Sequence, residues 1–446
     1  MEHQVERPRS SGSGRSPNPR APLAGLLSFL FPGLGQAYNG QSRLAWLLAA
    51  PTLVLVGAVV VLMLIGRSQL TRVFDVRVLI WLIALDLGFL AWRLLAIIQA
   101  HARRERPSPR SWATWATALL LIATLAMHAV PAYYAAKAID TLDTVALGGT
   151  HGGDLGDIFP AFSNLPEPSA QPDVSSGDRV NVLFVGVDSA PGRTSANTDT
   201  MLVVSMGANG TRPAMVSIPR DLYGIPLPNG QPFNHKLNSL MVYAGARPNE
   251  FPLGGVGTLK ATIGKLLGVP IQYFVAINLP GFEAAVNAVG GVDIMVTRAV
   301  NDPFEGYHIQ PGTYHMDGRA ALAFVHLRKG IGESDFTRAD RQQQLLAALR
   351  AQLAAGNLLF TLPAVLDAVK NLIVTDVPSD RIAELAQVVQ EADMSQLRRI
   401  VLQPPEYMTA DPFSQAGYIL IPDLEAIHAI GESMLGAVSP RPSPLP

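Results

Sequence analysis

Three long apolar runs in the first third of the chain limit its fold more than any other feature. They cover residues 44–65, 78–100 and 112–134. Each is close to the roughly 20 residues with which a helix crosses a hydrocarbon layer about 30 Å thick. The sequence therefore predicts an α-helical membrane region over residues 21–137 with about three spans, and a membrane as one partner.

A shorter apolar run over residues 23–34 precedes these three and ends at a Pro-Gly-Leu-Gly sequence. Helices break readily at such residues, so we expect a re-entrant or interfacial piece here. Within the second long run, Asp86 and Arg93 stand seven residues apart and share one helical face, where they can pair. A packing role for them is favoured over transport.

The arginines predict how the membrane region is oriented. Four lie in the first 20 residues, ahead of the first long run, and four lie between the second and third, namely Arg7, Arg9, Arg15, Arg20, Arg103, Arg104, Arg106 and Arg110. Because cytoplasmic segments carry an excess of basic residues, both segments should be cytoplasmic. We expect a multi-pass protein of the cell membrane whose N-terminus is cytoplasmic and whose C-terminal domain is extracytoplasmic.

Composition predicts how the rest of the chain is organised. Residues 1–20 form a disordered basic N-terminus, residues 138–179 a Gly-, Pro- and Ser-rich flexible linker, and residues 438–446 a disordered tail. Residues 180–355 form the main folded domain, which residues 356–437 extend. The net charge of −1 gives no reason to expect nucleic acid as a partner. The absence of cysteine excludes disulfides and Cys-ligated zinc.

Alternating strand and helix patterns predict the fold class of this domain. Residues 180–187, 200–206 and 213–219 are β-rich and closely connected, which is typical of an antiparallel meander. Helical and strand patterns then alternate over residues 255–267, 269–278, 281–289 and 291–296. We expect an α/β fold, an α-β-α sandwich with a mixed, partly antiparallel central sheet, preceded by the α-helical membrane region.

Charged residues stand at the ends of the three meander strands. Asp188 follows the first strand, Asp199 precedes the second, and Arg220 follows the third. In an antiparallel meander these three ends share one edge of the sheet, so the three side chains should meet. Any one of them alone would more often be a solvated residue at a strand end. Their convergence favours a site.

A second group of charges begins a later helix. Thr337, followed three residues later by Asp340, approximates a capping box and predicts a helix start there. Arg338 and Arg341 would then lie in the first turn, where the helix dipole and their mutual repulsion oppose them.

A bound anion would relieve both effects and take the free backbone N–H groups of that helix. Internal neutralisation by Asp335 and Asp340 is an equal alternative. Arg328 and Lys329, just upstream, favour a phosphate site.

Seven separate motifs in this region, in order, resemble those of the LytR-CpsA-Psr family of bacterial cell-envelope enzymes. They lie at residues 181–189, 198–201, 217–221, 236–238, 290–293, 321–328 and 335–342. The resemblance covers residues 180 to about 355. It implies a phosphotransferase that moves a teichoic acid-like glycopolymer from a polyprenyl-pyrophosphate carrier onto a peptidoglycan acceptor, with Mg²⁺ or Mn²⁺ as cofactor.

The resemblance also implies roles for individual residues. Asp188 and Asp199 would be metal ligands, and Asp199 would also accept the proton of the acceptor hydroxyl. The other catalytic residues would be Arg220, Arg338 and Arg341. The residues that bind substrate phosphate would be Arg220, Lys236, Arg328, Arg338, Arg341 and Gln342. A pocket for the prenyl chain would have to open between the sheet and the helices.

Two positions depart from the family pattern. Asn197 and His326 stand where family members commonly carry arginine, so at least one phosphate contact is missing or weakened. Two alternatives stay open beside the transferase. One is a pyrophosphatase or hydrolase of polyprenyl-pyrophosphate lipids, and the other is a non-catalytic module that binds lipid phosphates.

Overall fold

The structure is a computed structural model in which two compact units can be described separately. One unit is Met1–Gln69 with Leu79–Ala136, and the other is Leu70–Val78 with Lys137–Pro446. The described residues are 19–65, 76–104, 111–146, 179–187, 197–207, 212–303, 306–328, 330, 332–355, 368, 373–378, 381, 384–385, 388–389 and 392–436.

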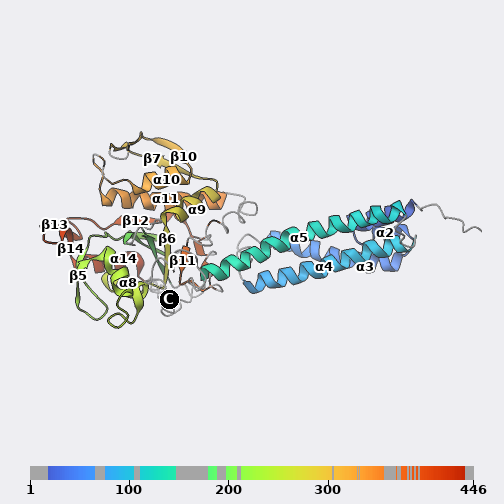
Figure 1. Cartoon of the computed structure of the whole chain (residues 1–446), viewed down its shortest axis with the longest axis horizontal. Coiled ribbons are helices and arrows are strands. Elements are labelled where there is room, and N and C mark those ends of the chain that lie inside the picture. The colour runs from blue at the N-terminus through green and yellow to red at the C-terminus, as the bar shows by residue number, and fades with distance from the viewer. Residues whose placement is uncertain are drawn as a thin grey trace, which may run out of the picture. The chain divides into compact units, whose positions relative to one another are not determined.

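The N-terminal unit consists of helices (Figure 1). They are α1 (Arg20–Leu30), α2 (Leu34–Tyr38), α3 (Ser42–Ile65), α4 (Val76–Ala102) and the start of α5 (Trp112–Ala146). Two of them, α4 and α5, are long and apolar enough to cross a membrane over Val76–Ala102 and Trp112–Asp140. Few of their residues are buried inside the protein, which is consistent with a membrane anchor. The number of crossings and the orientation stay predictions.

The expected helix break after the first apolar run is confirmed. α1 ends at Leu30 and α2 begins at Leu34, with Gly33 between them at a φ of 103°. A Cβ at Gly33 would lie 2.4 Å from the carbonyl oxygen of Ala45, so a side chain has no room there. In α2, Gln36 donates to the carbonyl oxygen of Ala96 at 2.8 Å and thereby ties this short helix to α4.

The expected pairing of Asp86 with Arg93 is wrong. Asp86 Oδ1 lies 2.7 Å from Nδ1 of His128 in α5, and Arg93 donates to the carbonyl oxygen of Phe29 in α1. Residues seven apart in a helix are separated by about 10 Å along its axis, so neighbouring helices offer closer partners. These side chains link helices of the unit, which is the favoured packing role.

The second unit is built on one six-stranded sheet in the order β11-β6-β1-β2-β3-β12. Its strands are β1 (Arg179–Val187), β2 (Thr198–Gly207), β3 (Ala214–Ser217), β6 (Tyr273–Asn278), β11 (Ile373–Thr375) and β12 (Arg398–Val401). β1, β2 and β3 pair antiparallel, whereas β6 and β12 run parallel to their neighbours β1 and β3. The predicted meander and mixed sheet are confirmed.

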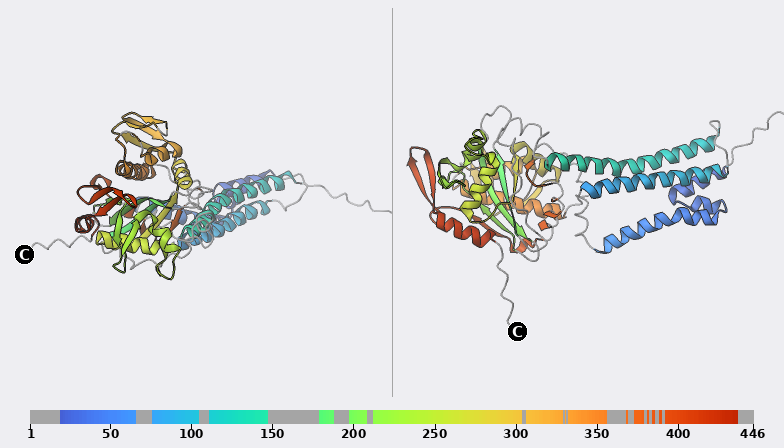
Figure 2. Two further views of the ribbon diagram at one scale, coloured as in Figure 1. Left: turned by 60° about the vertical axis from the view of Figure 1, so that its left-hand side comes forward. Right: turned by 90° about the horizontal axis from the view of Figure 1, so that it is seen from below.

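Helices cover the sheet on both faces (Figures 1 and 2). On one face, Leu183 and Val203 belong to a core shared with α7 (Leu240–Gly245), α8 (Gly254–Leu267) and α14 (Leu424–Leu435). On the other, Leu202 and Val204 pack against Leu346 of α11. The alternation follows from the two-residue period of a strand. The helices on this second side are α9 (Leu279–Ala288), α10 (Gly318–His326) and α11 (Asp335–Ala355).

Four two-stranded sheets and two 3-10 turns also belong to the described part of this unit. The paired strands are β4 (Tyr223–Pro226) with β5 (Pro232–Lys236), β7 (Val292–Val296) with β10 (Gly312–Met316), β8 (Val300–Asp302) with β9 (Tyr307–Ile309), and β13 (Met408–Ser414) with β14 (Gly417–Pro422). The turns are η4 (Leu237–Ser239) and η5 (Met394–Gln396).

The later predicted elements largely match, with one difference in a boundary. The strand expected over residues 269–278 begins only at Tyr273. Gly268 adopts a left-handed conformation after α8, and the amide of Val269 donates to the carbonyl oxygen of Gly264 to end that helix. Val269 is therefore part of the C-terminal cap of α8 and does not belong to strand β6.

Residues beyond 356 supply both edge strands of the sheet, β11 and β12. Beside β11, Asp376 forms a buried ion pair with Lys260 of α8, and its other carboxylate oxygen accepts from the amide of Phe274 at 2.6 Å. Burial raises the pKa of Asp376 even though Lys260 contacts it. The boundaries expected at residues 137, 179 and 355 stay predictions.

We predict that Lys260→Met lowers the free energy of unfolding by about 3–5 kcal/mol, because the carboxylate of Asp376 is left buried without a counter-charge. The apparent melting temperature of the full chain in detergent should fall by on the order of 10 °C. Lys260→Met combined with Asp376→Leu should recover much of that loss. Equal melting of wild type and the single variant would contradict the importance of the pair.

Candidate active site

A charged cluster lies at one edge of the meander, where the sequence predicted it. Asp199 is the second residue of β2, and Arg220 follows the end of β3. Because β2 and β3 are antiparallel neighbours, these positions share one edge, and Arg220 Nη1 lies 2.6 Å from Asp199 Oδ1. The expected meeting of these two is confirmed, while Asp188 lies outside the described residues.

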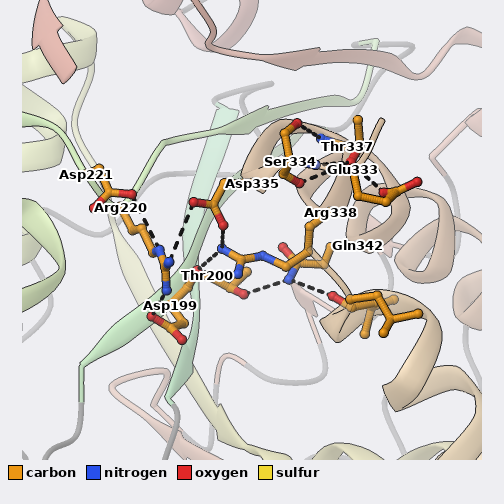
Figure 3. A network of polar contacts seen from close by, with 12 residues as sticks. Asp199, Thr200, Arg220, Asp221, Glu333, Ser334, Asp335, Thr337, Arg338 and Gln342 are labelled. Atoms are coloured by element: carbon orange, nitrogen blue, oxygen red, sulfur yellow. Dashed lines mark hydrogen bonds and ion pairs between the residues drawn. The ribbon is translucent and has the colours of Figure 1, made fainter. Parts of the chain in front are cut away.

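Helix α11 adds a second arginine to this cluster. Arg338 Nη2 lies 3.0 Å from Asp335 Oδ1 and donates to the carbonyl oxygen of Asp199 at 3.1 Å. The other carboxylate oxygen of Asp335 is 3.6 Å from Arg220 Nη2. Asp335 therefore stands between the two guanidinium groups, as Figure 3 shows.

The two arginines are charged groups in a place with little water. Arg338 is only 5% exposed, and this burial lowers its pKa despite the neighbouring Asp335. Burial also lowers the pKa of Arg220. The neighbouring carboxylates of Asp199, Asp335 and Asp221 raise it by a larger amount, so the pKa of Arg220 is raised from its ordinary value. Within the part of the chain that the structure describes, the buried Nε–H groups of both arginines have no hydrogen-bond acceptor. Such donors suit a bound anion.

The start of α11 differs from the prediction, because the helix begins at Asp335 and Ser334 provides the cap. The amide of Thr337 donates to Ser334 Oγ at 3.2 Å, and the amide of Ser334 donates to Thr337 Oγ1 at 2.9 Å. The capping box is thus Ser334 with Thr337, and the prediction placed it three residues too late.

Arg338 is the fourth residue of α11 and completes its first turn, whereas Arg341 lies in the second turn. The expected conflict with the helix dipole is therefore confined to Arg338, because that effect fades after the first turn. The capping box already takes two of the backbone N–H groups on which the expected anion depended, those of Ser334 and Thr337. An anion here would bind arginine side chains.

Arg341 has partners other than the phosphate that the sequence predicted. Its guanidinium forms a buried ion pair with Glu333 and donates to the carbonyl oxygens of Phe324 and Leu327. It is 3% exposed and lines none of the cavities described below. Internal neutralisation was one of the two expected alternatives, but Glu333 fills the role given to Asp340. The contacts favour a positioning role for Arg341 at the end of α10.

The remaining predicted phosphate ligands spread around the cluster. Gln342, one turn after Arg338, donates to Thr200 Oγ1 at 2.9 Å. Lys236 pairs with Asp221 at 2.9 Å, and Arg328 lies half-buried beside the same loop. His326 stands exposed at the end of α10. Direct phosphate binding by these side chains stays a prediction.

An apolar cavity of about 130 Å³ opens between the sheet and helices α9, α10 and α11. Its polar lining residues include Asp199, Arg338, Gln342 and His326, which join it to the charged cluster. Its apolar lining consists of Phe184, Val185, Val187, Leu202, Ile277, Leu279, Phe282, Leu322, Val325, Leu345 and Leu346. The family resemblance implied a pocket for the prenyl chain, but the sequence did not show which residues line it.

A second cavity, of about 270 Å³, shares no lining residue with the first. Its lining consists of Pro219, Arg220, Asp221, Arg328, Ser334, Asp335, Phe336, Tyr418 and Leu420. A small third cavity of about 20 Å³ is lined by residues from both, including Asp199 and Arg338 of the first and Arg220 and Asp335 of the second. The charged cluster thus separates an apolar cavity from a polar one.

The predicted metal site can be compared with the donors present. Among the described residues, no three His, Asp or Glu side chains are grouped to hold a metal ion. Of the two predicted ligands, only Asp199 is described. Magnesium commonly binds through one or two carboxylates and otherwise through substrate phosphates. A carboxylate beside two arginines fits an ion held chiefly by a bound pyrophosphate.

Sequence reasoning missed Glu333 and Tyr418 and treated Asp335 only as a neutralising charge. Glu333 immediately precedes the capping residue of α11. An acidic residue directly before a helix that carries two arginines was the sequence signal that could have identified it. Tyr418 offered no signal, because it reaches the site through a hairpin about 80 residues further along the chain.

Glu333→Gln should lower the free energy of unfolding at pH 7 by about 1.5–3 kcal/mol, since the hydrogen bonds of Arg341 lose a charged acceptor. Burial alone would raise the pKa of Glu333, but the hydrogen bonds from Arg341 and Thr337 hold it below its ordinary value of 4.5. Its stabilising contribution is therefore complete above that value and is lost as pH falls through the lowered pKa.

The difference in melting temperature between wild type and Glu333→Gln should accordingly narrow below about pH 4.5. The matched control is Glu432→Gln, because the Glu432 side chain is 61% exposed. A constant difference between wild type and Glu333→Gln from pH 7 to pH 3 would show that the ion pair is not responsible.

Comparison with known proteins places this geometry in a family. Residues 163–421, more than half of the chain, match the model of the LytR_cpsA_psr family. The polyisoprenyl-teichoic acid–peptidoglycan teichoic acid transferase TagU of Bacillus mycoides is 31% identical over 212 residues, which are 48% of this chain and 65% of that protein. TagU of Oceanobacillus iheyensis is 30% identical over 47% of this chain and 62% of its own length.

The chain therefore spans slightly less than two thirds of the length of these curated relatives. Among solved structures, Bacillus subtilis TagV is similar with a TM-score of 0.47 and 22% identity, covering 59% of this chain and 99% of TagV. Bacillus subtilis TagU is similar with a TM-score of 0.44 and 23% identity, covering 60% and 100%.

Proposed function

This chain belongs to the LytR-CpsA-Psr family, and we propose that it transfers a glycopolymer from a polyprenyl-pyrophosphate carrier onto peptidoglycan in cell-wall assembly. The observation that carries the proposal is a pair of arginines beside the polar end of an apolar cavity, the buried Arg338 and the half-buried Arg220. A lipid that ends in a pyrophosphate has the same two parts in the same order. The names of the TagU relatives, which are teichoic acid transferases, support a teichoic acid-like glycopolymer.

The apolar cavity would take the part of the isoprenoid chain nearest the pyrophosphate. Burying each CH₂ group contributes about 0.8 kcal/mol, so even a few isoprene units anchor the carrier. With the chain seated between the sheet and α9, α10 and α11, its pyrophosphate would reach Arg338 and then Arg220. The Nε–H groups of these arginines, which have no hydrogen-bond acceptor within the described residues, would then find acceptors in the phosphate oxygens.

The transfer itself is a displacement at the phosphorus that carries the glycan. The acceptor hydroxyl oxygen forms a bond to this phosphorus while the bond to the bridging oxygen of the pyrophosphate breaks. Polyprenyl phosphate leaves with the bridging oxygen, and the hydroxyl proton passes to the carboxylate of Asp199. Arg220 and Arg338 stabilise the charge that gathers on the phosphate oxygens.

Asp199 is paired with Arg220 before substrate arrives, at 2.6 Å. Phosphate oxygens that bind Arg220 would compete with this contact and release the carboxylate toward the acceptor hydroxyl. The side chains of Thr200 and Gln342, which form a hydrogen bond of 2.9 Å with each other, would line the same part of the site. The arrangement gives each charged side chain a role without a large movement of the backbone.

Magnesium or manganese is proposed as the cofactor, with Asp199 and Asp188 as its protein ligands. The ion would neutralise charge on the pyrophosphate oxygens when bound. We propose a multi-pass cell-membrane protein with a cytoplasmic N-terminus, because arginine-rich segments flank the first and third apolar runs and the lipid carrier and peptidoglycan meet outside.

We predict that Arg338→Ala lowers kcat/KM by about 100- to 1000-fold and Asp199→Asn by about 100- to 10,000-fold. The assay uses the full chain in detergent with a synthetic polyprenyl-pyrophosphate glycan, soluble peptidoglycan fragments and Mg²⁺, and follows glycan coupled to the fragment. Chelation should abolish coupling, and added Mg²⁺ should restore it. Arg319→Ala is the matched control, because Arg319 is exposed on α10 and lines none of the described cavities.

Other products would contradict the transferase. Free glycan without coupling, under conditions where the fragment is a competent acceptor, would identify a hydrolase. Binding of the donor lipid without any turnover would identify a binding module. Full coupling by both variants would place the chemistry away from the charged cluster.

A further inference from the structure

The polar cavity of about 270 Å³ has the chemical character of a saccharide site. Its walls combine two arginines and two carboxylates with the aromatic rings of Phe336 and Tyr418. Sugar rings present hydroxyl groups at their edges and apolar C–H groups on their faces. Charged hydrogen-bonding groups around an aromatic ring suit both parts.

Tyr418 enters this cavity from the hairpin of β13 and β14, which is attached to the loop that carries Arg220 and Asp221. Its neighbour on the same face of β14, Leu420, donates its amide to the carbonyl oxygen of Asp221 at 3.0 Å, and Leu420 also bridges to Leu222. Tyr418 itself is 43% exposed, so its ring is open to a ligand. Burial, Asp221 and Asp335 raise the pKa of its hydroxyl, which therefore stays a donor in neutral solution.

The position of this cavity relative to the other two restricts what it can hold. In phosphoryl transfer, the attacking and leaving oxygens lie roughly in line on opposite sides of the phosphorus. The leaving polyprenyl phosphate has its chain in the apolar cavity, so the attacking hydroxyl must come from another direction. The polar cavity shares no lining residue with the apolar one and meets it only through the charged cluster.

We propose that the polar cavity binds a pyranose ring of the peptidoglycan acceptor, stacked on Tyr418, and that this residue determines affinity for the acceptor. The proposal rests on the proposed function, because it assigns the attacking group to this cavity. The transfer step and its proton are those given above. The same chemistry would suit a sugar of the donor glycan, and the experiment distinguishes the two sources.

The test varies a soluble peptidoglycan fragment at saturating donor lipid, with the full chain in detergent. Tyr418→Ala should raise the apparent KM for the fragment about 10-fold and leave kcat and the KM for the donor unchanged. Tyr418→Phe, which keeps the ring, should stay within about 3-fold of wild type. Phe413→Ala is the matched control, because Phe413 is in the same hairpin, is 94% exposed and lines none of the cavities.

A second measurement does not depend on turnover. Calorimetry of fragment binding without donor should show about a 10-fold weaker Kd for Tyr418→Ala. Calorimetry is needed because all five tryptophans, Trp46, Trp81, Trp92, Trp112 and Trp115, lie before residue 137. Melting temperatures of the variants verify that each is folded.

The possible outcomes separate this proposal from the proposed function. Wild type that transfers glycan, with fragment KM and Kd unchanged in Tyr418→Ala, overturns the acceptor site and leaves the transferase in place. A change confined to the donor KM also overturns it and assigns the cavity to the donor glycan. Fragment binding that Tyr418→Ala weakens, in a protein that transfers nothing, supports the site and refutes the transferase.

Discussion

Two arginines that stay charged with little access to water are the constraint around which the site is arranged. A buried charge without a partner is costly, so Arg220 and Arg338 require carboxylates beside them. Asp199 and Asp335 meet this need in an alternating order, with Asp335 shared between both arginines. The alternation leaves the Nε–H groups of both arginines without a hydrogen-bond acceptor within the described residues, although Arg220 Nε lies 3.6 Å from Asp221 Oδ2. In the proposed function, a phosphate would bind these donors without breaking every ion pair. The free protein is thereby stable and still ready for an anion.

This cluster depends on the placement of helix α11. Arg338 and Gln342 are four residues apart and face the start of β2, whereas Gln343 reaches Ser217 of β3 and the backbone of β12. The helix is thus tied to three strands by polar contacts as well as by its apolar side chains. Glu333 also stabilises the first turn of this helix, because its carboxylate forms an ion pair with Arg341 and accepts a hydrogen bond from the hydroxyl of Thr337. A shift of α11 by one turn would remove Arg338 from Asp199 altogether.

The segment after residue 356 has more than a supporting role. β12 lies beside β3, whose end carries Arg220, and β14 attaches directly to Asp221. The polar cavity therefore has one wall from the meander and another from the end of the chain. The apolar cavity draws instead on β1, β2 and the helices α9 to α11. Two different parts of the fold thus face the two sides of the charged cluster, which would give the proposed donor and acceptor separate surroundings.

Patterns of short range were enough to predict a large part of this protein. The β-rich runs of β1 to β3 and their short connections predicted the meander, and the meander predicted that Asp199 would meet Arg220. Apolar runs of sufficient length predicted the helices of the N-terminal unit, and two of them meet the requirements of a membrane span. In each case the information lies within a few neighbouring residues, where backbone periodicity dictates which side chains share a face.

Contacts between distant segments required the tertiary structure. The sequence pattern placed the helix cap at Thr337, and only the folded loop showed that Ser334 caps α11 and that Arg341 pairs with Glu333. Likewise, Asp86 pairs with His128 of another helix and Tyr418 joins Arg220 across about 200 residues of chain. Long, flexible and charged side chains can reach several partners at similar cost. The packing of helices and hairpins on the sheet decides which partner is near, and the local sequence does not specify that packing.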